Sequence, residues 1–413
     1  ANAAPLTGKG QHRMVKPLTE PQAKILVVDD KPKNIRLLEA FLIPGGHQVI
    51  NASNGEEALQ QVQQQRPDLI LLDLMMPIMD GYEVLKHLKA DERWREIPVI
   101  MISALDDIKR VAQCIERGAE DYLPKPFDPV LLRARVNACL EKKRLRDQAK
   151  EYSDRLEREL QAARDIQMSM VPTIFPAPEP TRPVEISATL EPARQVGGDL
   201  YDFFYTDEGQ LCFLIGDVSD KGAPAALFMA RTTALVRLVD NLLRTSDGGP
   251  PTPEQIMNRV NDELCRDNGM QMFVTLLLGV LDPMSGALKC CNAGHLAPYV
   301  LGRNGVKSLE TAQGIPLGIS TSLGYDSSGW TLSPGDCLFI FTDGITEAMD
   351  SEGKLFGKKR LEEALQAVAR EEPTKVVAAV IEKISEFTDA VPQSDDIAAM
   401  ALRYGILSGP GNR

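Results

Sequence analysis

The first third of the chain alternates short apolar runs with segments whose apolar residues recur at helical spacing. Three of the runs, ILVV at 25–28, LILL at 69–72 and VIMI at 99–102, are continuously apolar, as strands buried on both faces should be. The strand-like stretches are 24–30, 47–52, 68–73, 98–103 and 120–124, and the helical stretches that follow them are 32–43, 55–65, 81–90, 107–117 and 128–141. Five such βα units in a row predict a doubly wound α/β fold of the flavodoxin-like kind, with five parallel strands in the order 2-1-3-4-5 and helices on both faces.

The stretch at 141–170 contains no Gly or Pro and carries dense charge of both signs. Glu151 and Arg155 have the i, i+4 order that supports a helix. Apolar residues fall on a heptad seam, broken at position 159, that consists of Leu145, Ala149, Tyr152, Leu156, Ala163, Ile166 and Met170. We therefore expect one helix to continue from the first domain into a linker at 142–171. The pattern fits both a solitary signalling helix packed on its own domain and a dimeric coiled coil.

A proline-rich stretch at 172–183 ends this helix, and a second domain follows. Its strand-like runs are 185–190, 211–218, 272–281, 287–292, 336–342 and 396–402, and its helical runs are 223–243, 253–266, 358–369 and 373–387. Most of the strands follow one another without an intervening helix, and this grouping predicts an α+β layer fold for residues 172–404. The first domain is placed at 22–141, and the two ends, 1–21 and 405–413, are expected to be disordered tails.

Charge, cysteine content and histidine content narrow the range of functions. A formal net charge of −12 over 413 residues disfavours a nucleic-acid surface. No apolar run approaches the ~20 residues of a membrane span, and residues 1–20 lack the apolar core of a secretory signal. Seven cysteines without a C-x-x-C pair suggest a reducing compartment, so we expect a cytoplasmic protein. The four histidines show no paired spacing, so a metal site would use carboxylate oxygens, the ligands of Mg²⁺ or Mn²⁺.

Polar residues mark the carboxyl ends of the predicted parallel strands. Asp29 and Asp30 end strand 1, Asp73 ends strand 3, Ser103 ends strand 4 and Lys125 follows strand 5. Ligands bind beyond these ends in this fold, so the five groups should converge. The acids would repel one another without a cation, and a Mg²⁺ held by Asp29 or Asp30, by Asp73 and by a backbone carbonyl would relieve that repulsion. With Lys125 and Ser103 as partners of a phosphoryl group, Asp73 would be the nucleophile that forms an aspartyl phosphate.

The motifs VVDD (27–30), DLMMPIMDG (73–81), SA (103–104) and KPF (125–127) resemble the receiver domain of two-component response regulators. The resemblance implies that Asp73 is phosphorylated by a histidine kinase or a phosphotransfer protein. It also implies that Met75 offers its backbone carbonyl to the metal, and that Ser103 and Tyr122 form the switch pair.

Acidic motifs recur in the second domain where strand-like segments meet predicted turns. They are GGDLYD (197–202), GDVSDKG (216–222), TDGITEA (342–348) and SDD (394–396). If these acids meet, two hard metal ions could activate a water and clamp a phosphoryl oxygen, which is the chemistry of metal-assisted phosphate ester hydrolysis. The first motif begins like the GGDEF signature of cyclic-dinucleotide synthases, but Leu200 and Tyr201 replace the acid and the aromatic that this signature requires.

The ordered set AARDIQMSMVP, PARQVGGDLYDFF, IGDVSDKGAPAALFMA, CNAGHLAPYVL, GIPLGI, FTDGITEAMD and SDDIAAMAL resembles the PPM-type serine/threonine phosphatases of the SpoIIE/RsbU group over residues 160–403. The resemblance implies a β-sandwich flanked by helices, with two Mn²⁺ or Mg²⁺ ions at one end. Asp217 would bridge both metals and Val218 would lend its carbonyl. Asp343 and Asp395 would complete the shell of one metal, and Asp396 is the less favoured ligand of the pair Asp395 and Asp396. Asp199 would act from the GGD turn.

The same resemblance implies a substrate, a phosphoserine or phosphothreonine on a small anti-sigma-factor antagonist, whose phosphate Arg194 or Lys221 would contact. His295 in NAGH is interpreted as a structural, hydrogen-bonding histidine. Glu347 is interpreted as a cap of the following helix, with an outer metal shell as the alternative.

Together these features predict a two-component response regulator whose output is a metal-dependent serine/threonine phosphatase in partner switching, with Asp73, Ser103 and Lys125 active in the receiver and Asp217 and Asp343 in the phosphatase. The alternative is a pseudophosphatase adaptor that binds a sigma-factor regulator without catalysis. A DNA-binding regulator is disfavoured, because the chain shows neither a basic recognition helix nor positive charge. We expect no nucleic-acid or membrane partner.

Overall fold

The computed structural model describes residues 22–104, 108–247, 250–389 and 391–405. The chain divides between Arg155 and Leu156 into two compact units, which are described separately. The predicted tails at 1–21 and 406–413 lie outside the described residues, whereas Gly405, which was assigned to the second tail, follows directly on the last strand.

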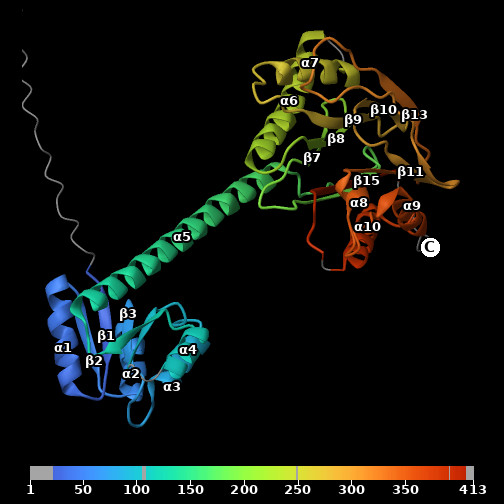
Figure 1. Ribbon diagram of the computed structural model, residues 1–413. Coiled ribbons are helices and arrows are strands. Elements are labelled where there is room, and N and C mark those ends of the chain that lie inside the picture. Colours follow the sequence, from blue (N-terminus) through green and yellow to red (C-terminus); the bar gives the residue numbers. More distant parts are fainter. Residues whose placement is uncertain (1–21, 105–107, 248–249, 390, 406–413) are drawn as a thin grey trace, which may run out of the picture. The chain divides into compact units, whose positions relative to one another are not determined.

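The first unit is a parallel five-stranded sheet with helices on both faces (Figure 1). Its strands are β1 (Lys24–Val28), β2 (Gln48–Ala52), β3 (Leu69–Asp73), β4 (Val99–Ala104) and β5 (Asp121–Lys125). Its helices are α1 (Pro32–Leu42), the short 3-10 helix η1 (Ile43–Gly45), α2 (Gly55–Gln65), α3 (Gly81–Ala90) and α4 (Ile108–Glu116), followed by the start of α5 (Pro129–Met170). The strand order is β2-β1-β3-β4-β5, so the flavodoxin-like prediction is confirmed.

Strand alternation divides the apolar residues of this sheet between two cores. Leu26, Ile70 and Met101 face α2 and α3, whereas Ile25, Leu71 and Ile100 face α1 and the start of α5. Both faces are covered, which explains why these strands are continuously apolar in sequence.

The helix α5 is continuous over 42 residues, so the predicted continuation of the last helix of the first unit is confirmed. Leu132 and Val136, near its beginning, belong to the core of the first unit. Gln167, near its end, is buried in the second unit.

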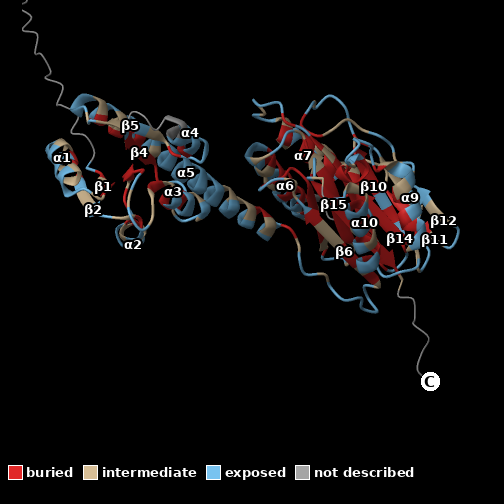
Figure 2. Cartoon of the chain, turned by 60° about the horizontal axis from the view of Figure 1, so that its bottom comes forward, coloured by how far each residue is buried: buried red, intermediate tan, exposed pale blue. Residues whose placement is uncertain are grey.

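The second unit contains two five-stranded sheets, both visible as predominantly buried strands in Figure 2. One sheet has the order β13-β10-β9-β8-β7 and the other has the order β12-β11-β14-β15-β6. The strands are β6 (Val184–Glu191), β7 (Leu200–Tyr205), β8 (Leu211–Val218), β9 (Val274–Leu281), β10 (Ala287–Ala293), β11 (Tyr299–Gly302), β12 (Gly305–Ser308), β13 (Ser327–Thr331), β14 (Cys337–Phe341) and β15 (Ile397–Tyr404).

The two sheets share one apolar core, and helices cover the outer faces. Leu338 and Ile340 of β14 meet Leu214 and Leu278 of the first sheet in that core. The helices α6 (Ala223–Asp247) and α7 (Pro253–Cys265) pack on the first sheet, and α9 (Gly357–Ala367) and α10 (Pro373–Thr388) pack on the second. The predicted β-sandwich flanked by helices is therefore confirmed.

Sequence patterns missed five elements of this unit. The strand β7 carries Asp202 among its aromatic residues, and β11, β12 and β13 have only four or five residues each. The four-residue helix α8 (Gly344–Glu347) was also missed. Periods of two or 3.6 residues cannot be recognised over such short lengths.

None of the helices in the part of the chain that the structure describes combines the length and the apolar character that a membrane crossing requires.

Candidate functional site

The first candidate site lies at the carboxyl ends of β1, β3 and β5. Asp29, Asp30 and Asp73 each offer one carboxylate oxygen, and these atoms lie within 4.8 Å of one another. Asp73 is the last residue of β3, and Asp29 and Asp30 directly follow β1, its neighbour in the sheet. The sequence prediction that these acids converge agrees with this geometry.

Lys125 bridges two of the three acids. Its Nζ lies 2.9 Å from Asp29 Oδ2 and 2.8 Å from Asp73 Oδ2. Burial raises the pKa of Asp73, and the charges of Asp29 and Asp30 raise it further, although Lys125 opposes this. Burial alone would lower the pKa of Lys125, but its two ion pairs raise it above the usual value. One cation therefore does not compensate the three acids.

The two acids after β1 differ in their partners. Asp29 accepts hydrogen bonds from the Lys31 backbone N–H at 2.9 Å and from Asn34 Nδ2 at 2.9 and 2.8 Å. Asp30 Oδ1 is buried and has no hydrogen-bond partner among the described residues. A buried carboxylate oxygen without a donor, beside two further acids, fits a divalent cation such as Mg²⁺. The geometry favours Asp30 over Asp29 as a direct ligand.

The predicted switch pair has one buried and one exposed member. Ser103 is buried in β4, while Tyr122 of β5 is exposed and lies under the Arg135 guanidinium, 5.6 Å from the ring centroid. Met75 lies two residues after Asp73, and its exposed side chain contacts Arg110 Nη1. The switch role of Ser103 and Tyr122 and the metal role of the Met75 carbonyl stay predictions.

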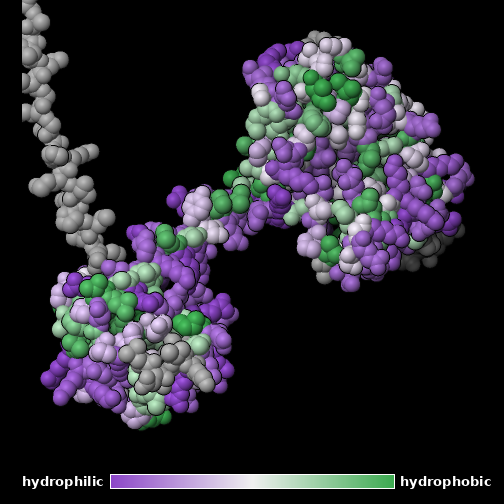
Figure 3. Space-filling view, viewed as in Figure 1, coloured by the Kyte–Doolittle hydropathy of each residue, from purple (hydrophilic) through white to green (hydrophobic). Residues whose placement is uncertain are grey.

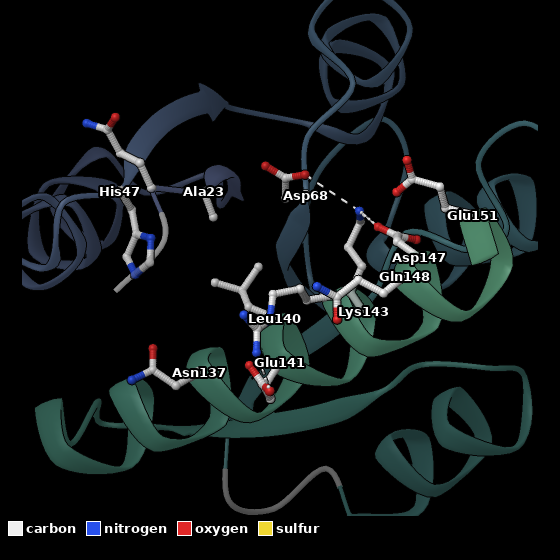
Figure 4. Close-up of a pocket in the computed structure, with 12 residues that line it drawn as sticks. Ala23, His47, Asp68, Asn137, Leu140, Glu141, Lys143, Asp147, Gln148 and Glu151 are labelled. Carbon is white, nitrogen blue, oxygen red and sulfur yellow. Dashed lines mark hydrogen bonds and ion pairs between the residues drawn. The ribbon is translucent and has the colours of Figure 1, made fainter. Parts of the chain in front are cut away.

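A cavity of about 430 Å³ in the first unit lies away from these acids (Figure 4). It is lined by Ala23, His47 and Asp68, which precede β1, β2 and β3, and by residues of α5. It is therefore at the amino ends of the strands, the opposite edge from Asp73. Within it, Lys143 of α5 lies 3.6 Å from Asp68 and 2.5 Å from Asp147, an arrangement that ties α5 to the start of β3.

The second candidate site gathers acids from both sheets of the sandwich. Asp199 directly precedes β7, Asp217 is the last residue but one of β8, and Asp343 lies between β14 and α8. Asp395 and Asp396 directly precede β15. Their charges act on one another, because Asp343, Asp395 and Asp396 all raise the pKa of Asp217. Four motifs separated by up to about half of the chain thus meet at one end of the sandwich.

Asp199 is the most buried member of this group. Its Oδ2 accepts a hydrogen bond from Thr342 Oγ1 at 2.6 Å, and Thr342 in turn accepts one from the Ala398 backbone N–H at 2.8 Å. Leu200 pairs with Gly216 in the sheet, so Asp199 lies beside Asp217. Sequence reasoning assigned no role to Thr342; its only signal is its position directly before the strand-end acid Asp343.

The proton affinities of these acids are strongly perturbed. Burial, followed by the charge of Asp217, raises the pKa of Asp199 well above its usual value. Burial and the charges of Asp343 and Asp395 raise the pKa of Asp217 to about 7. Burial and the charge of Glu347 raise the pKa of Asp343. Without a compensating positive charge, these carboxyl groups hold protons to unusually high pH.

Lys221 is the cation that the structure brings to this group. Its Nζ lies 3.0 Å from Asp395 Oδ2 and donates to the Ser394 carbonyl at 2.9 Å. The side chain of Arg194, the other residue proposed to contact phosphate, is exposed. The Val218 carbonyl oxygen faces the GGD turn so closely that a Cβ on Gly198 would lie 2.9 Å from it.

Asp396 bonds the loop before Asp199 through both of its carboxylate oxygens. Its Oδ1 accepts the Ala193 backbone N–H at 2.8 Å and its Oδ2 accepts the Gly198 backbone N–H at 2.6 Å. Both oxygens are thus engaged by the chain itself. Those of Asp395 are engaged as well, because Oδ1 accepts the Asp396 backbone N–H at 3.0 Å and Oδ2 pairs with Lys221. The preference for Asp395 as the metal ligand of the pair stays a prediction.

The donor set of the second site fits divalent cations of the hard type. Among the described residues, only the acids of the first unit include three whose ligand atoms all lie within 4.8 Å. Two ions about 4 Å apart would each take part of an acid set, so the acids of the second site need not form one cluster of that size. Asp199, Asp217, Asp343 and Asp395, with the Val218 carbonyl, are the oxygen donors that would hold them.

Two further interpretations have clear outcomes. His295 is buried, its Nδ1 lies 3.0 Å from Thr275 Oγ1 and its Nε2 lies 3.0 Å from the Phe341 carbonyl, so the structural interpretation is confirmed. Burial lowers the pKa of His295 to about 4. The cap interpretation of Glu347 is wrong, since it is the last residue of α8 and no side chain caps α8 or α9. Its charge instead acts on Asp343.

Two family models match this chain. Residues 25–137 match the response regulator receiver domain, and residues 207–405 match stage II sporulation protein E (SpoIIE). The chain therefore joins a receiver domain to a SpoIIE-type domain.

Known proteins resemble each part. Protein IcfG of Synechocystis sp. is 32% identical over 275 residues, which are 62% of this chain and 43% of IcfG. The response regulator PleD of Caulobacter vibrioides is 49% identical over 116 residues, 28% of this chain and 26% of PleD. The chain thus spans less than half the length of these curated relatives. A solved structure, the SiaA-PP2C domain of Pseudomonas aeruginosa, matches with a TM-score of 0.52 at 20% identity. The match covers 61% of this chain and 98% of the SiaA domain, so the second unit and the SiaA domain have the same fold.

Proposed function

We propose that this protein is a response regulator whose output is a metal-dependent protein serine/threonine phosphatase. The observation that carries the proposal is the group Asp199, Asp217, Asp343 and Asp395, brought from four strand ends to one edge of the sandwich. Burying these ionised acids without compensating cations costs free energy, which favours their protonated forms. The pKa values of Asp199 and Asp217 are raised for this reason.

The reaction would be hydrolysis of a phosphoserine or phosphothreonine ester. Two Mn²⁺ or Mg²⁺ ions would supply an activated water and neutralise the phosphoryl oxygens. Attack of the water oxygen on phosphorus breaks the bond from phosphorus to the side-chain oxygen, which takes up a proton as inorganic phosphate leaves. The chain's own residues would hold this arrangement: Thr342 donates a hydrogen bond to Asp199, and Lys221, which is paired with Asp395, would contact the substrate phosphate.

The receiver would control this output through an aspartyl phosphate on Asp73. Lys125, which bridges Asp73 and Asp29, would pair with the phosphoryl group, and Ser103 would donate a hydrogen bond to it. The donor would be a histidine kinase or a phosphotransfer protein. The buried Ser103 and the exposed Tyr122 would then change together as the switch pair.

The substrate that this proposal favours is a phosphorylated anti-sigma-factor antagonist in a partner-switching pathway. The support is the likeness to the SpoIIE family model over residues 207–405, together with the assembled acids. A homodimer through α5 is part of the proposal, because apolar residues such as Tyr152 and Ile166 remain exposed along that helix.

The test measures phosphate released from a phosphoserine-bearing anti-sigma-factor antagonist and from a phosphoserine peptide, with Mn²⁺ and then with EDTA. We expect release with Mn²⁺ that EDTA abolishes and that Asp343→Asn lowers by at least about 100-fold. If the wild-type protein releases no more phosphate than Asp343→Asn, the phosphatase proposal is wrong. Binding of the antagonist without release would support the adaptor alternative.

A further inference from the structure

The loop that carries Asp199 has no regular structure of its own. Residues 192–199 connect β6 of one sheet to β7 of the other. Asp396 holds this loop at both ends through the backbone N–H groups of Ala193 and Gly198. The position of Asp199 therefore depends on groups outside the loop.

Two side chains of α5, Gln167 and Arg164, also contact this loop. Gln167 Nε2 donates to the Gly197 carbonyl at 2.7 Å, and its Oε1 accepts the Gly197 N–H at 3.2 Å. Arg164, one turn earlier in α5, donates to the Arg194 carbonyl at 3.0 Å. The amide of Gln167 thus bonds both backbone polar groups of one residue, Gly197, which lies two residues before Asp199.

Burial makes these two hydrogen bonds costly to break. Gln167 is 4% exposed, whereas Ile166 beside it is 66% exposed. A buried polar side chain that loses its partners cannot exchange them for water, so the amide has one favourable position. Asp396 also lies close to Gly197, because a Cβ at this position would lie 2.2 Å from Asp396 Oδ2. Gly197 therefore has both Gln167 and Asp396 as close neighbours.

We propose that Gln167 is a positioning residue of the phosphatase site, which sets the place of Asp199 through its hydrogen bonds to Gly197. The catalytic consequence rests on the function proposed above, while the effect on metal binding does not. The helix that carries Gln167 also contributes Leu132 and Val136 to the core of the receiver. A change at the end of α5 would therefore reach the metal site through Gln167.

The experiment compares Gln167→Leu and Gln167→Glu with the same substitutions at Gln161 in the full-length protein. Gln161 is an exposed glutamine of the same helix, and its Nε2 bonds only Asp165 Oδ1, at 3.0 Å, among the described contacts. Mn²⁺ binding is measured from the electron paramagnetic resonance signal of the unbound ion. Binding that is lost in Asp343→Asn is assigned to the phosphatase site, which separates it from binding by the receiver acids.

We expect both substitutions at Gln167 to weaken this Mn²⁺ binding and to lower kcat on a phosphoserine peptide about 10-fold or more, with KM changed by less than about twofold. The substitutions at Gln161 should change neither. Gln167→Glu should recover relative to wild type as the pH falls from 8 to 6, because the introduced carboxyl can donate to the Gly197 carbonyl once protonated. The charged groups that contact the same loop are Asp396, which would raise the pKa of the introduced carboxyl, and Arg164, which would lower it.

Equal Mn²⁺ affinity in the Gln167 and Gln161 variants, or a Gln167→Glu defect that does not depend on pH, would overturn the proposal. If Gln167→Leu does not fold, Gln167→Glu, which keeps the size of the side chain, decides the matter alone. If the wild-type protein hydrolyses no phosphoserine but Gln167→Glu still weakens Mn²⁺ binding in a pH-dependent way, the positioning role stands and the phosphatase function fails.

Discussion

At the scale of single residues, uncharged groups determine how the acids of the candidate phosphatase site are held. The hydroxyl of Thr342 joins Asp199 of one sheet to the Ala398 backbone N–H of the other. It donates to a carboxylate, so it stabilises the charged form of Asp199 against the burial that favours the neutral form.

We predict that Thr342→Val weakens Mn²⁺ binding and destabilises the protein by about 1–3 kcal/mol, because the Ala398 N–H and Asp199 both lose a buried partner. Mn²⁺ titration and thermal unfolding measure the two effects. Thr232→Val is the matched control, since Thr232 is equally buried but its hydroxyl bonds only the Phe228 carbonyl within α6. A loss of Mn²⁺ affinity in both variants would contradict the prediction.

The metal-free site should make stability depend on pH. The pKa of Asp217 is about 7 in the folded protein against 3.8 for an ordinary carboxyl, so the folded state binds more protons. This stabilisation is complete below pH 3.8 and is lost as the pH rises through about 7. We predict that, in EDTA, the melting temperature of the second unit falls by several degrees between pH 5.5 and pH 8.

Asp217→Asn should flatten this pH dependence, because the group that titrates is removed. Saturating Mn²⁺ should reverse it in the wild-type protein, since the metal binds the ionised acids. A melting temperature in EDTA that rises from pH 5.5 to pH 8 would contradict the assignment of the raised pKa values.

At the scale of elements, α5 presents an apolar face that its own unit does not cover. Tyr152 is 70% exposed, and Leu145 and Leu156 are also exposed. Figure 3 shows hydrophobic patches interrupting the hydrophilic surface of this helix. A solitary helix packed on its own domain would bury these residues, so the exposure favours the coiled-coil interpretation.

We predict that the protein is a dimer and that Tyr152→Glu shifts it toward monomer at least about tenfold in dissociation constant. Sedimentation velocity over a range of concentrations measures the change. Lys150→Glu, an exposed position off the heptad seam, is the control and should have little effect. A wild-type protein that is monomeric at all concentrations would favour the solitary helix.

The long elements were predictable from sequence because their burial leaves a pattern. All five residues of β14 are buried, since Leu338 and Ile340 face the shared core while Phe339 and Phe341 face the helices α9 and α10. The continuous apolar run at this strand therefore reports burial on both faces. The short edge strands β12 and β13 are only partly buried and leave no such run.

At the scale of the whole molecule, one chain holds a candidate phosphoryl-accepting site and a candidate phosphoryl-removing site. We predict that acetyl phosphate, a small phosphoryl donor for Asp73, changes the rate of phosphate release by about fivefold or more. Asp73→Asn should remove this response. If wild-type protein and Asp73→Asn respond equally, the donor acts elsewhere and control by the receiver is contradicted.

The sequence by itself determined the two domain types, the receiver strand order and the acids of each candidate site, because buried strands that end in carboxylates leave a local pattern. Only the tertiary structure decided how those acids are held. Thr342, Gln167 and the turn of Asp396 toward Ala193 and Gly198 depend on hydrogen bonds between residues far apart in the chain. Such bonds leave no period or spacing in the sequence, since each partner taken alone looks like an ordinary polar residue.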